Sequence, residues 1–263
     1  MRAIVPYAPK SRSRLWVIQK LALLTIICVS LARAGEFATN HHGTTYHGYV
    51  CQPDQVIITW ADTNGAPLRT FQATAHHLRA KHIQPLYMVN AGIFNEGGIP
   101  AGLLVERGEV KRPLNLDDGA GNFYLKPNGV FFVDADGAAI VESHRYSTMM
   151  ARPRFAIQSG PMLLLEGLHH PEFRPASSNR LHRNGVGILP DGNVLFAITE
   201  PFQDQLPNLY EFAQFFAARG CRNALVLDGD LSQSTTYPTT NALSDNHFGA
   251  IISVRQSDTA ERK

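Results

Sequence analysis

The chain reads Ala-Leu-Val-Leu-Asp-Gly-Asp-Leu-Ser-Gln-Ser at residues 224–234, and this stretch has the pattern of a buried strand that ends on a carboxylate. Four apolar residues precede Asp228 and Gly229, and hydroxyl groups follow at Ser232 and Ser234. Asp and Gly are ordinary turn residues, so a turn explains this ending as well as a ligand-binding edge does. The neighbouring elements have to decide between the two.

A helix is predicted directly before this strand, over residues 209–219. Asn208 can cap it, and Glu211 completes a capping box. The same order occurs a second time, because residues 70–81 have a helical pattern and precede an apolar strand that runs into Asn90-Ala-Gly. Sheets with helices packed on them commonly bind ligands at such strand ends. Both strand ends therefore point to a site.

The middle of the chain has the alternation of short strands and turns that is typical of β-hairpins. Short apolar runs flank turns of the x-Gly or Asp-Gly type, at residues 107–108, 134–137, 166–167 and 190–193. No repeat, low-complexity tract or interdomain linker interrupts residues 35–255. We therefore predict an α+β fold, a single domain over residues 35–263 with a mixed, mostly antiparallel sheet and packed helices.

Residues 1–34 have the features of a secretory signal peptide. Five basic residues precede an apolar run at residues 21–31, and Ala32-Arg-Ala34 supplies a small-x-small cleavage site before Gly35. The run is short for a membrane span, although an uncleaved membrane anchor stays the alternative. We expect an exported protein, periplasmic or secreted, that meets the membrane only through this segment before cleavage.

The charge balance changes once this segment is removed. Six of the 24 basic residues lie in it and no acidic residue does, so residues 35–263 carry 18 basic and 22 acidic side chains, a net charge of −4. A mildly acidic domain without a basic run argues against nucleic acid as a partner. Cys51 and Cys221 remain after cleavage, and the sequence leaves open whether they pair or stay free.

Several common catalytic motifs are absent from the sequence. It contains no Gly-x-Ser-x-Gly elbow, no His-Glu-x-x-His zinc helix and no Gly-x-x-x-x-Gly-Lys phosphate loop. The run Asp134-x-Asp136 is similar to the start of a calcium loop. It lacks the later acidic ligands of such a loop, so we predict a hairpin turn there.

Two further motifs place polar residues beside apolar runs. Ser159 and Gly160 lie in Gln-Ser-Gly-Pro at residues 158–161, where a bend between strands is a sufficient explanation. Arg183 and Asn184 precede another β-run, where a solvated strand start would be ordinary, although a guanidinium also matches phosphate geometry. Taken singly, neither motif establishes a function.

The order of the motifs carries more information than any one of them. Along the chain come Asn90-Ala-Gly-Ile-Phe, Gly119-Ala-Gly-Asn-Phe followed by Lys126-Pro-Asn-Gly, Gln158-Ser-Gly-Pro-Met, Arg183-Asn-Gly-Val-Gly and Leu227-Asp-Gly-Asp-Leu-Ser. In this order the chain resembles the phosphodiester glycosidase family over residues 55–254, and more closely the family's exported bacterial branch. The resemblance implies hydrolysis of the bond between a sugar's anomeric carbon and a phosphate, with a carbohydrate or sugar phosphate as the partner.

The resemblance also implies roles for individual residues. Asp228 would be the nucleophile or general base, and Arg183 would clamp the phosphate. Two-acid chemistry would use a second carboxylate, for which Glu200 is the best candidate and Asp230 the next, while a solvated loop end explains either residue as well. Backbone amides would approach the ligand at three glycines, and side chains would bind or orient it at four more positions. These are Gly92, Gly160 and Gly229, and Asn90, Ser159, Asn184 and Ser232.

Asp230 departs from the family pattern, which usually has Gly at this position. A carboxylate here would repel a phosphate unless it points away or binds a cation. The sequence requires no cofactor, but Asp228 and Asp230 together would suit a divalent cation. The departure also supports a second interpretation, a non-catalytic glycan-binding or envelope-associated protein. A serine acyl hydrolase that uses Ser159 is the weaker third interpretation, because no motif places a His.

Overall fold

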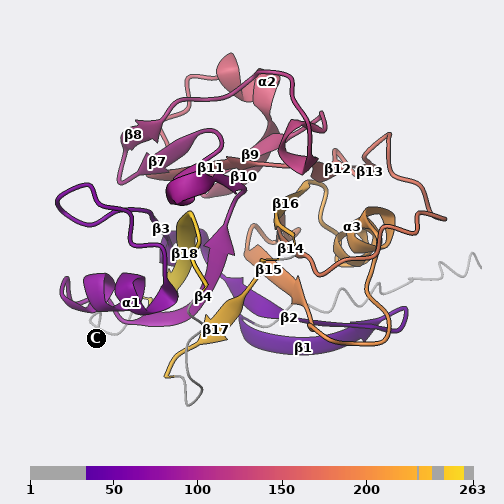
Figure 1. Cartoon of the computed structure of the whole chain (residues 1–263), viewed down its shortest axis with the longest axis horizontal. Coiled ribbons are helices and arrows are strands. Elements are labelled where there is room, and N and C mark those ends of the chain that lie inside the picture. Colours follow the sequence, from indigo (N-terminus) through magenta and orange to yellow (C-terminus); the bar gives the residue numbers. More distant parts are fainter. Residues whose placement is uncertain (1–33, 230, 239–245, 258–263) are drawn as a thin grey trace, which may run out of the picture. The chain divides into compact units, whose positions relative to one another are not determined.

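The computed structural model describes residues 34–229, 231–238 and 246–257, all within one compact unit of the chain, Ala32–Lys263. Antiparallel strands dominate this unit and helices are few (Figure 1). The predicted antiparallel, single-domain architecture is confirmed, but the fold is dominated by its sheets rather than balanced between helices and strands. None of the helices in the described part of the chain is long and apolar enough to cross a membrane.

The largest sheet has seven strands in the order β1-β2-β15-β14-β16-β12-β13, and all its pairs are antiparallel. The strands span Gly35–His41 (β1), Thr44–Cys51 (β2), Val194–Thr199 (β15), Asn184–Ile188 (β14), Ala224–Asp228 (β16), Met162–Leu165 (β12) and Leu168–His169 (β13). The apolar run at residues 224–227 therefore forms a buried strand, as predicted, and β16 is paired on both edges.

Two further antiparallel sheets have the orders β17-β4-β18-β3 and β10-β9-β11-β7-β8. The first contains Val56–Thr59 (β3), Pro85–Ala91 (β4), Ser234–Thr236 (β17) and Ala250–Arg255 (β18). The second contains Leu104–Glu106 (β7), Glu109–Arg112 (β8), Gly129–Val133 (β9), Ala138–Glu142 (β10) and Phe155–Ser159 (β11). A small ladder joins Phe94–Asn95 (β5) to Ile99–Pro100 (β6), and single 3₁₀ turns occupy Pro53–Gln55, Glu96–Gly98 and Asn122–Tyr124.

The β9–β10 connection is the hairpin turn predicted for the calcium-like motif. Asp134 N donates to Gly137 O at 2.9 Å, which closes the turn. The Asp134 carboxylate accepts the Asp136 amide at 2.9 Å, so this carboxylate stabilises the turn itself. An Asp side chain that bonds the backbone two residues on is a common turn device.

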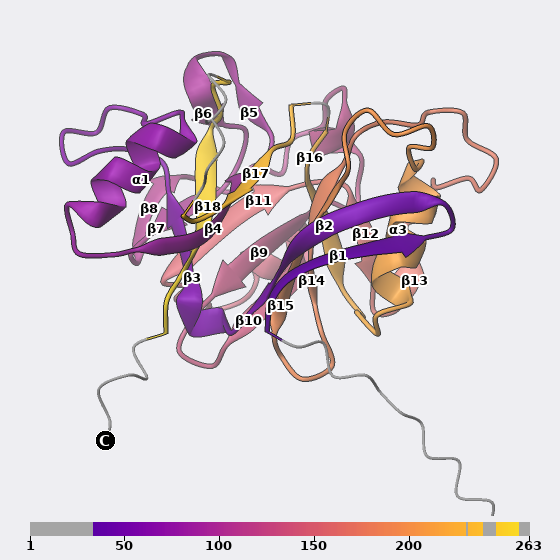
Figure 2. The same cartoon turned by 90° about the horizontal axis from the view of Figure 1, so that it is seen from below.

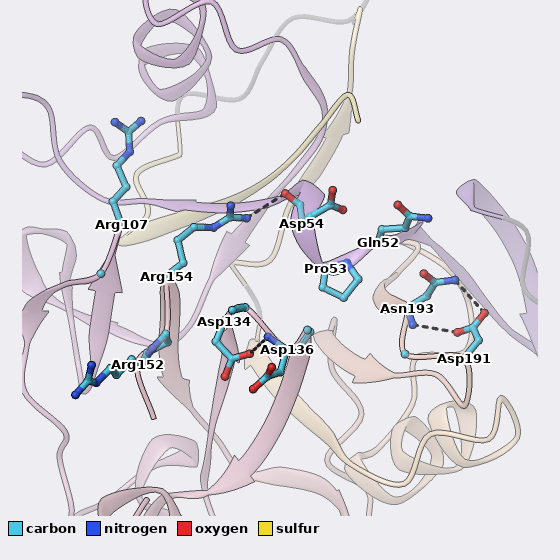
Figure 3. A pocket seen from close by; sticks show the side chains of 16 residues that line it. Gln52, Pro53, Asp54, Arg107, Asp134, Asp136, Arg152, Arg154, Asp191 and Asn193 are labelled. Atoms are coloured by element: carbon cyan, nitrogen blue, oxygen red, sulfur yellow. Dashed lines mark hydrogen bonds between the residues drawn. The ribbon is translucent and has the colours of Figure 1, made fainter. Parts of the chain in front are cut away.

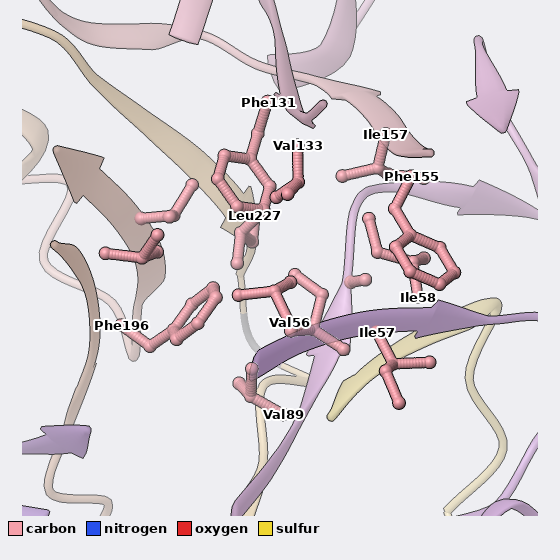
Figure 4. Packing of buried hydrophobic residues seen from close by; sticks show 14 of the residues in the cluster. Val56, Ile57, Ile58, Val89, Phe131, Val133, Phe155, Ile157, Phe196 and Leu227 are labelled. Atoms are coloured by element: carbon pink, nitrogen blue, oxygen red, sulfur yellow. The ribbon is translucent and has the colours of Figure 1, made fainter. Parts of the chain in front are cut away.

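One apolar cluster joins the three larger sheets. Fully buried side chains converge on it from β4, β9, β11, β15 and β16 (Figure 4), namely Val89, Phe131, Ile157, Phe196 and Leu227. Burial of each such side chain stabilises the fold by about 1.5–3 kcal/mol relative to exposure. Because these strands share one core, the core also fixes where their ends lie relative to one another.

Two helices cover the strands from opposite sides (Figure 2): α1 (Phe71–Arg79) and α3 (Leu209–Ala217). The Thr70 hydroxyl caps α1 by accepting the Ala73 amide at 3.1 Å. The capping box predicted for α3 is confirmed, since Asn208 Oδ1 accepts Glu211 N at 2.9 Å and Glu211 Oε2 accepts Asn208 N at 3.2 Å. The buried aromatic face of α3 packs on the seven-stranded sheet.

A third, short helix, α2 (Ser143–Ser147), is absent from the sequence-based prediction. The Glu142 carboxylate caps it by accepting the amides of His144 at 3.0 Å and Arg145 at 2.9 Å. Its sequence has no apolar periodicity, so the pattern that reveals longer helices gives no signal here.

Cys51 and Cys221 are free thiols, and both are buried. Cys51 lies in the cluster that joins the sheets, whereas Cys221 lies in the separate cluster beneath α3. Burial raises the pKa of both thiols, that of Cys221 to about 12. The question that the sequence left open is thus answered in favour of two unpaired, protonated thiols.

Candidate functional site

The ends of strands β4 and β16 meet through a side-chain hydrogen bond. Asn90 Nδ2 donates to Asp228 Oδ2 at 2.6 Å, across 138 residues of sequence. The first residue of β14, Asn184, is the register partner of Asp228. The fold therefore brings together three of the predicted site residues, Asn90, Asn184 and Asp228, at one end of the sheets.

Asn90 is almost completely buried, and its neighbours fix the orientation of its amide. Asn90 Oδ1 accepts the Gln233 backbone amide at 2.9 Å, so Nδ2 must be the atom that faces Asp228. Asn184 Nδ2 donates to the Asn90 backbone carbonyl at 2.8 Å. Asn90 thus connects β14, β16 and the segment that follows β16.

Asp228 is half-buried, and both of its oxygens accept hydrogen bonds. Oδ2 accepts from Asn90, and Oδ1 accepts the Gly229 amide at 2.8 Å. These two bonds orient the carboxylate at the point where the strand ends. A reactive carboxylate needs such fixed geometry.

Two polar side-chain atoms, on the register partner of Asp228 and on the segment that follows β16, are buried and have no hydrogen-bond partner in the described part of the chain. They are Asn184 Oδ1 and Ser232 Oγ, on residues that are 0% and 3% exposed. A buried polar atom left without a partner costs about 1–3 kcal/mol. Both atoms therefore suit a polar ligand that reaches the end of β16.

Ser159 braces two sheets. Its hydroxyl donates to the Leu227 carbonyl at 2.8 Å and accepts the Ile93 amide at 3.3 Å, and the residue is fully buried. The hydroxyl proton is therefore committed to a backbone carbonyl of β16. This contact disfavours the serine acyl hydrolase interpretation and gives Ser159 a structural role beside Asp228.

The three glycines predicted to let backbone approach a ligand differ in their surroundings. A Cβ on Gly92, where φ is +63°, would lie 2.8 Å from Ile157, and a Cβ on Gly160 would lie 2.6 Å from the Asn128 Cβ. Close packing explains these two glycines. A Cβ on Gly229 would meet nothing within 4 Å, so Gly229 is the one of the three with open space above it.

Arg183 is 1% exposed, and its guanidinium binds loop backbone. Nε donates to the Pro207 carbonyl at 3.2 Å, and Nη2 donates to the Asn179 carbonyl at 2.9 Å. Arg183 also lines a small cavity of about 120 Å³ together with Tyr210. These contacts tie together the loops around the site, and the role of Arg183 as a phosphate clamp stays a prediction.

Glu200 follows β15, two strands away from β16, which separates their backbones by about 10 Å. Its carboxylate pairs with His47 of β2, with 2.5 Å between Oε2 and Nε2, and both side chains are about half exposed. The structure therefore does not bring Glu200 onto Asp228. Strand β2, which pairs with β15 on the side away from β14 and which the sequence could not place there, explains where Glu200 points.

His182 is a site neighbour that the sequence reasoning missed. Its Nε2 lies 2.9 Å from the Ser232 carbonyl, which can only accept, so Nε2 carries the proton. Its Nδ1 lies 2.8 Å from the Thr199 hydroxyl, which accepts the Arg183 amide and can donate to the ring. His182 thus holds the segment after β16 against β15. Its position directly before Arg183 was the available signal.

Asp230 lies outside the described residues, so the predicted cation site at Asp228 and Asp230 stays a prediction. In the part of the chain that the structure describes, no three His, Cys, Asp or Glu side chains form a group able to hold a metal ion.

Comparison with known proteins identifies the family of this chain. The family model for phosphodiester glycosidase matches residues 85–263, which is more than half of the chain. This protein belongs to the phosphodiester glycosidase family. The family resemblance inferred from motif order is therefore confirmed.

Relatives extend the comparison over most of the chain. The uncharacterized protein YigE of Escherichia coli K12 is 34% identical over 212 residues, which cover 80% of this chain and 81% of YigE. The zebrafish N-acetylglucosamine-1-phosphodiester α-N-acetylglucosaminidase catalytic domain, auto-inhibited by its pro-peptide, has the same fold with a TM-score of 0.60. It is 15% identical, and the match covers 86% of this chain and 83% of that domain. A putative exported protein of Burkholderia pseudomallei matches with a TM-score of 0.51 at 13% identity, over 80% and 74% of the two chains.

Proposed function

We propose that this protein is an exported hydrolase that cleaves the glycosidic bond between the anomeric carbon of a sugar and a phosphate. One observation carries the proposal beyond family membership. Asn90 orients Asp228 at the end of a buried strand, beside the unpartnered Asn184 Oδ1 and Ser232 Oγ. A sugar offers hydroxyl groups that can donate hydrogen bonds to both of these oxygens. A sugar phosphate would therefore supply the hydrogen-bond donors that the two oxygens lack.

In the proposed reaction, the bond between the anomeric carbon and the phosphate oxygen breaks, and its electron pair leaves with the phosphate. The products are a free sugar and a phosphomonoester. Because phosphate is a good leaving group, this step requires little help from a general acid. Asp228 either takes a proton from the attacking water, or attacks the carbon itself to form a glycosyl ester that a water molecule then hydrolyses to free the sugar and the carboxylate. The first route inverts the anomeric configuration and the second retains it.

A divalent cation at Asp228 and Asp230 is part of the proposal. Carboxylate oxygens suit hard cations, and such an ion would screen the two carboxylates from an incoming phosphate. Turnover measured with and without a chelator tests this point, and a chelator-resistant activity would remove the cation from the mechanism.

Release of free sugar from a panel of sugar-1-phosphodiesters tests the reaction. Asp228→Asn should abolish turnover in a folded protein, whereas Asn64→Ala, a change at an exposed turn residue, should not alter it. Arg183→Ala tests whether Arg183 binds the phosphate. Asp230→Gly tests the effect of the carboxylate at the position where the family usually has Gly. The anomer released, followed by NMR, assigns the role of Asp228. Equal turnover by the wild type and Asp228→Asn would contradict the proposal.

A non-catalytic glycan-binding role is the second candidate, and the position of Glu200 favours it. Glu200 pairs with His47, so the carboxylate predicted as the second acid does not face Asp228. If the wild type binds sugar phosphates in calorimetry without turning any over, and Asp230→Gly restores turnover, this second function holds.

Export is proposed from residues 1–34. Cell fractionation combined with N-terminal sequencing tests it, and we expect a mature protein that begins at Gly35 in the periplasm or the medium. A cytoplasmic protein that retains residues 1–34 would contradict export.

A further inference from the structure

A cleft of about 580 Å³ lies at the opposite strand ends from Asp228. Four basic side chains line it together with three apolar ones, and none of its lining residues in the described part of the chain is acidic. We call it the cationic cleft; its residues are Lys81, Arg107, Arg154 and Arg255, with Ile57, Ile83 and Phe155. Such a concentration of positive charge is unexpected in a chain whose residues 35–263 have a net charge of −4.

Three of these cations have no carboxylate partner in the described ranges. Lys81 Nζ contacts the His77 ring at 2.8 Å, and Arg154 donates to the Asp54 backbone carbonyl at 3.1 Å while its guanidinium lies 5.3 Å from the centre of the Phe155 ring. Arg107 projects from the exposed β7–β8 turn, and its side chain makes no hydrogen bond or ion pair with the described residues (Figure 3). Like charges gathered in this way repel one another unless an anion joins them.

The ionisation of the neighbouring groups agrees with this description. Burial, and then the charge of Arg107, lowers the pKa of Lys81. The carboxylate of Glu106 interacts with the charges of Lys81 and Arg107. Glu106 is partly buried, and this burial raises its pKa. It accepts the Trp60 amide at 3.3 Å and does not line the cleft.

A neighbouring pocket of about 970 Å³ shares Arg107 and Arg154 with the cationic cleft and makes a useful contrast (Figure 3). Four Asp residues line this pocket, so its charge is mixed. The carboxylates of Asp134 and Asp191 are occupied by amides of their own turns at 2.9 and 3.0 Å. Positive charge without acidic lining is therefore a property of the cationic cleft, not of this whole face.

Strands β4 and β18 run from the cationic cleft toward the site at Asp228. Arg255 of β18 pairs with Pro85 at the start of β4, and Ile251 pairs with Asn90 near its end. Five residues of strand separate Pro85 from Asn90, a distance of about 17 Å. An anion in the cleft would consequently leave the end of β16 open.

We propose that the cationic cleft binds phosphate groups of a polyanionic chain, as a second site apart from Asp228. Several cations that surround one volume favour a ligand with several linked anionic groups over a single small anion, because each exposed pair contributes little by itself. This proposal does not depend on the proposed hydrolase reaction.

Fluorescence anisotropy with a labelled inorganic polyphosphate chain tests the site, with unlabelled inorganic phosphate as the competitor. Arg107→Gln with Arg154→Gln should weaken binding about tenfold in low salt, and Arg107→Gln alone, at an exposed turn, should weaken it about threefold. The matched control removes two exposed arginines that line neither pocket, Arg145→Gln with Arg222→Gln, and should change affinity less than twofold. Asp228→Asn should leave the affinity unchanged.

Added salt should weaken wild-type binding more than it weakens binding by the double variant. Competition by inorganic phosphate should require a far higher concentration than competition by the unlabelled chain. Absence of polyphosphate binding by the wild type, equal losses in the control variant, or loss of binding in Asp228→Asn would each overturn the proposal. Thermal unfolding of each variant confirms that the compared proteins are folded.

Discussion

Asn90 Nδ2 and Asp228 Oδ2 lie 2.6 Å apart, and this contact joins two sheets that share one apolar core. Asn90 is buried, so its orientation is set by the Gln233 amide and by Asn184. The carboxylate at the end of β16 therefore has a fixed direction, which is the property that distinguishes it from an ordinary turn Asp.

Asn90→Ala should lower turnover about 10- to 100-fold, because Asp228 loses the bond that orients it. The variant also leaves the Gln233 amide without its acceptor, so stability should be measured alongside activity. We expect kcat to fall more than KM changes, since Asn90 acts through Asp228. A change confined to KM would instead make Asn90 a substrate contact.

Ser159→Ala should reduce the free energy of unfolding by about 1–3 kcal/mol, because the Leu227 carbonyl and the Ile93 amide lose a buried partner. Urea unfolding measures this loss, and Ser147→Ala, at an exposed hydroxyl in α2, is the matched control. Turnover per folded molecule should stay within about tenfold of the wild type. A loss of about a thousandfold would revive the serine nucleophile.

The features that the sequence predicted correctly depend on residues close together in the chain, and those that it missed depend on residues far apart in the chain. The capping box at Asn208 and Glu211, the turn at Asp134 and the strand that ends at Asp228 are encoded by neighbouring residues, and all three are confirmed. Contacts across sheets have no such local code. The pairing of Glu200 with His47 depends on β2 lying beside β15, which only the assembled sheet reveals.

His182→Ala should loosen the segment that follows β16, since the ring holds the Ser232 carbonyl against Thr199. Hydrogen exchange at the Gln233 amide measures this directly, and we expect it to become faster. His182→Gln retains a donor near the position of Nε2 and should restore part of the protection. Unchanged exchange in His182→Ala would remove His182 from the positioning network.

Glu200→Gln should change turnover by no more than about threefold, because the carboxylate faces His47 at a half-exposed surface. His47→Gln is the matched variant from the other side of the pair, and the two should behave alike. If Glu200→Gln alone reduces turnover a hundredfold while His47→Gln does not, Glu200 is the second catalytic carboxylate after all.

Acid should weaken the attachment of α3 through Glu211. Two hydrogen bonds of 2.6 Å from the Arg180 guanidinium hold the pKa of Glu211 below its usual value of 4.5. A depressed pKa in the folded state contributes stability that is present above the unfolded pKa and is lost as pH falls through the folded one. Glu211→Gln keeps the capping box but removes the charge, so it should cost about 0.5–1 kcal/mol at pH 7, and this cost should shrink as pH falls through the folded-state pKa of Glu211. Arg180→Gln should follow the same course in urea unfolding, and a loss that persists at low pH would assign the effect to the cap instead of the ion pair.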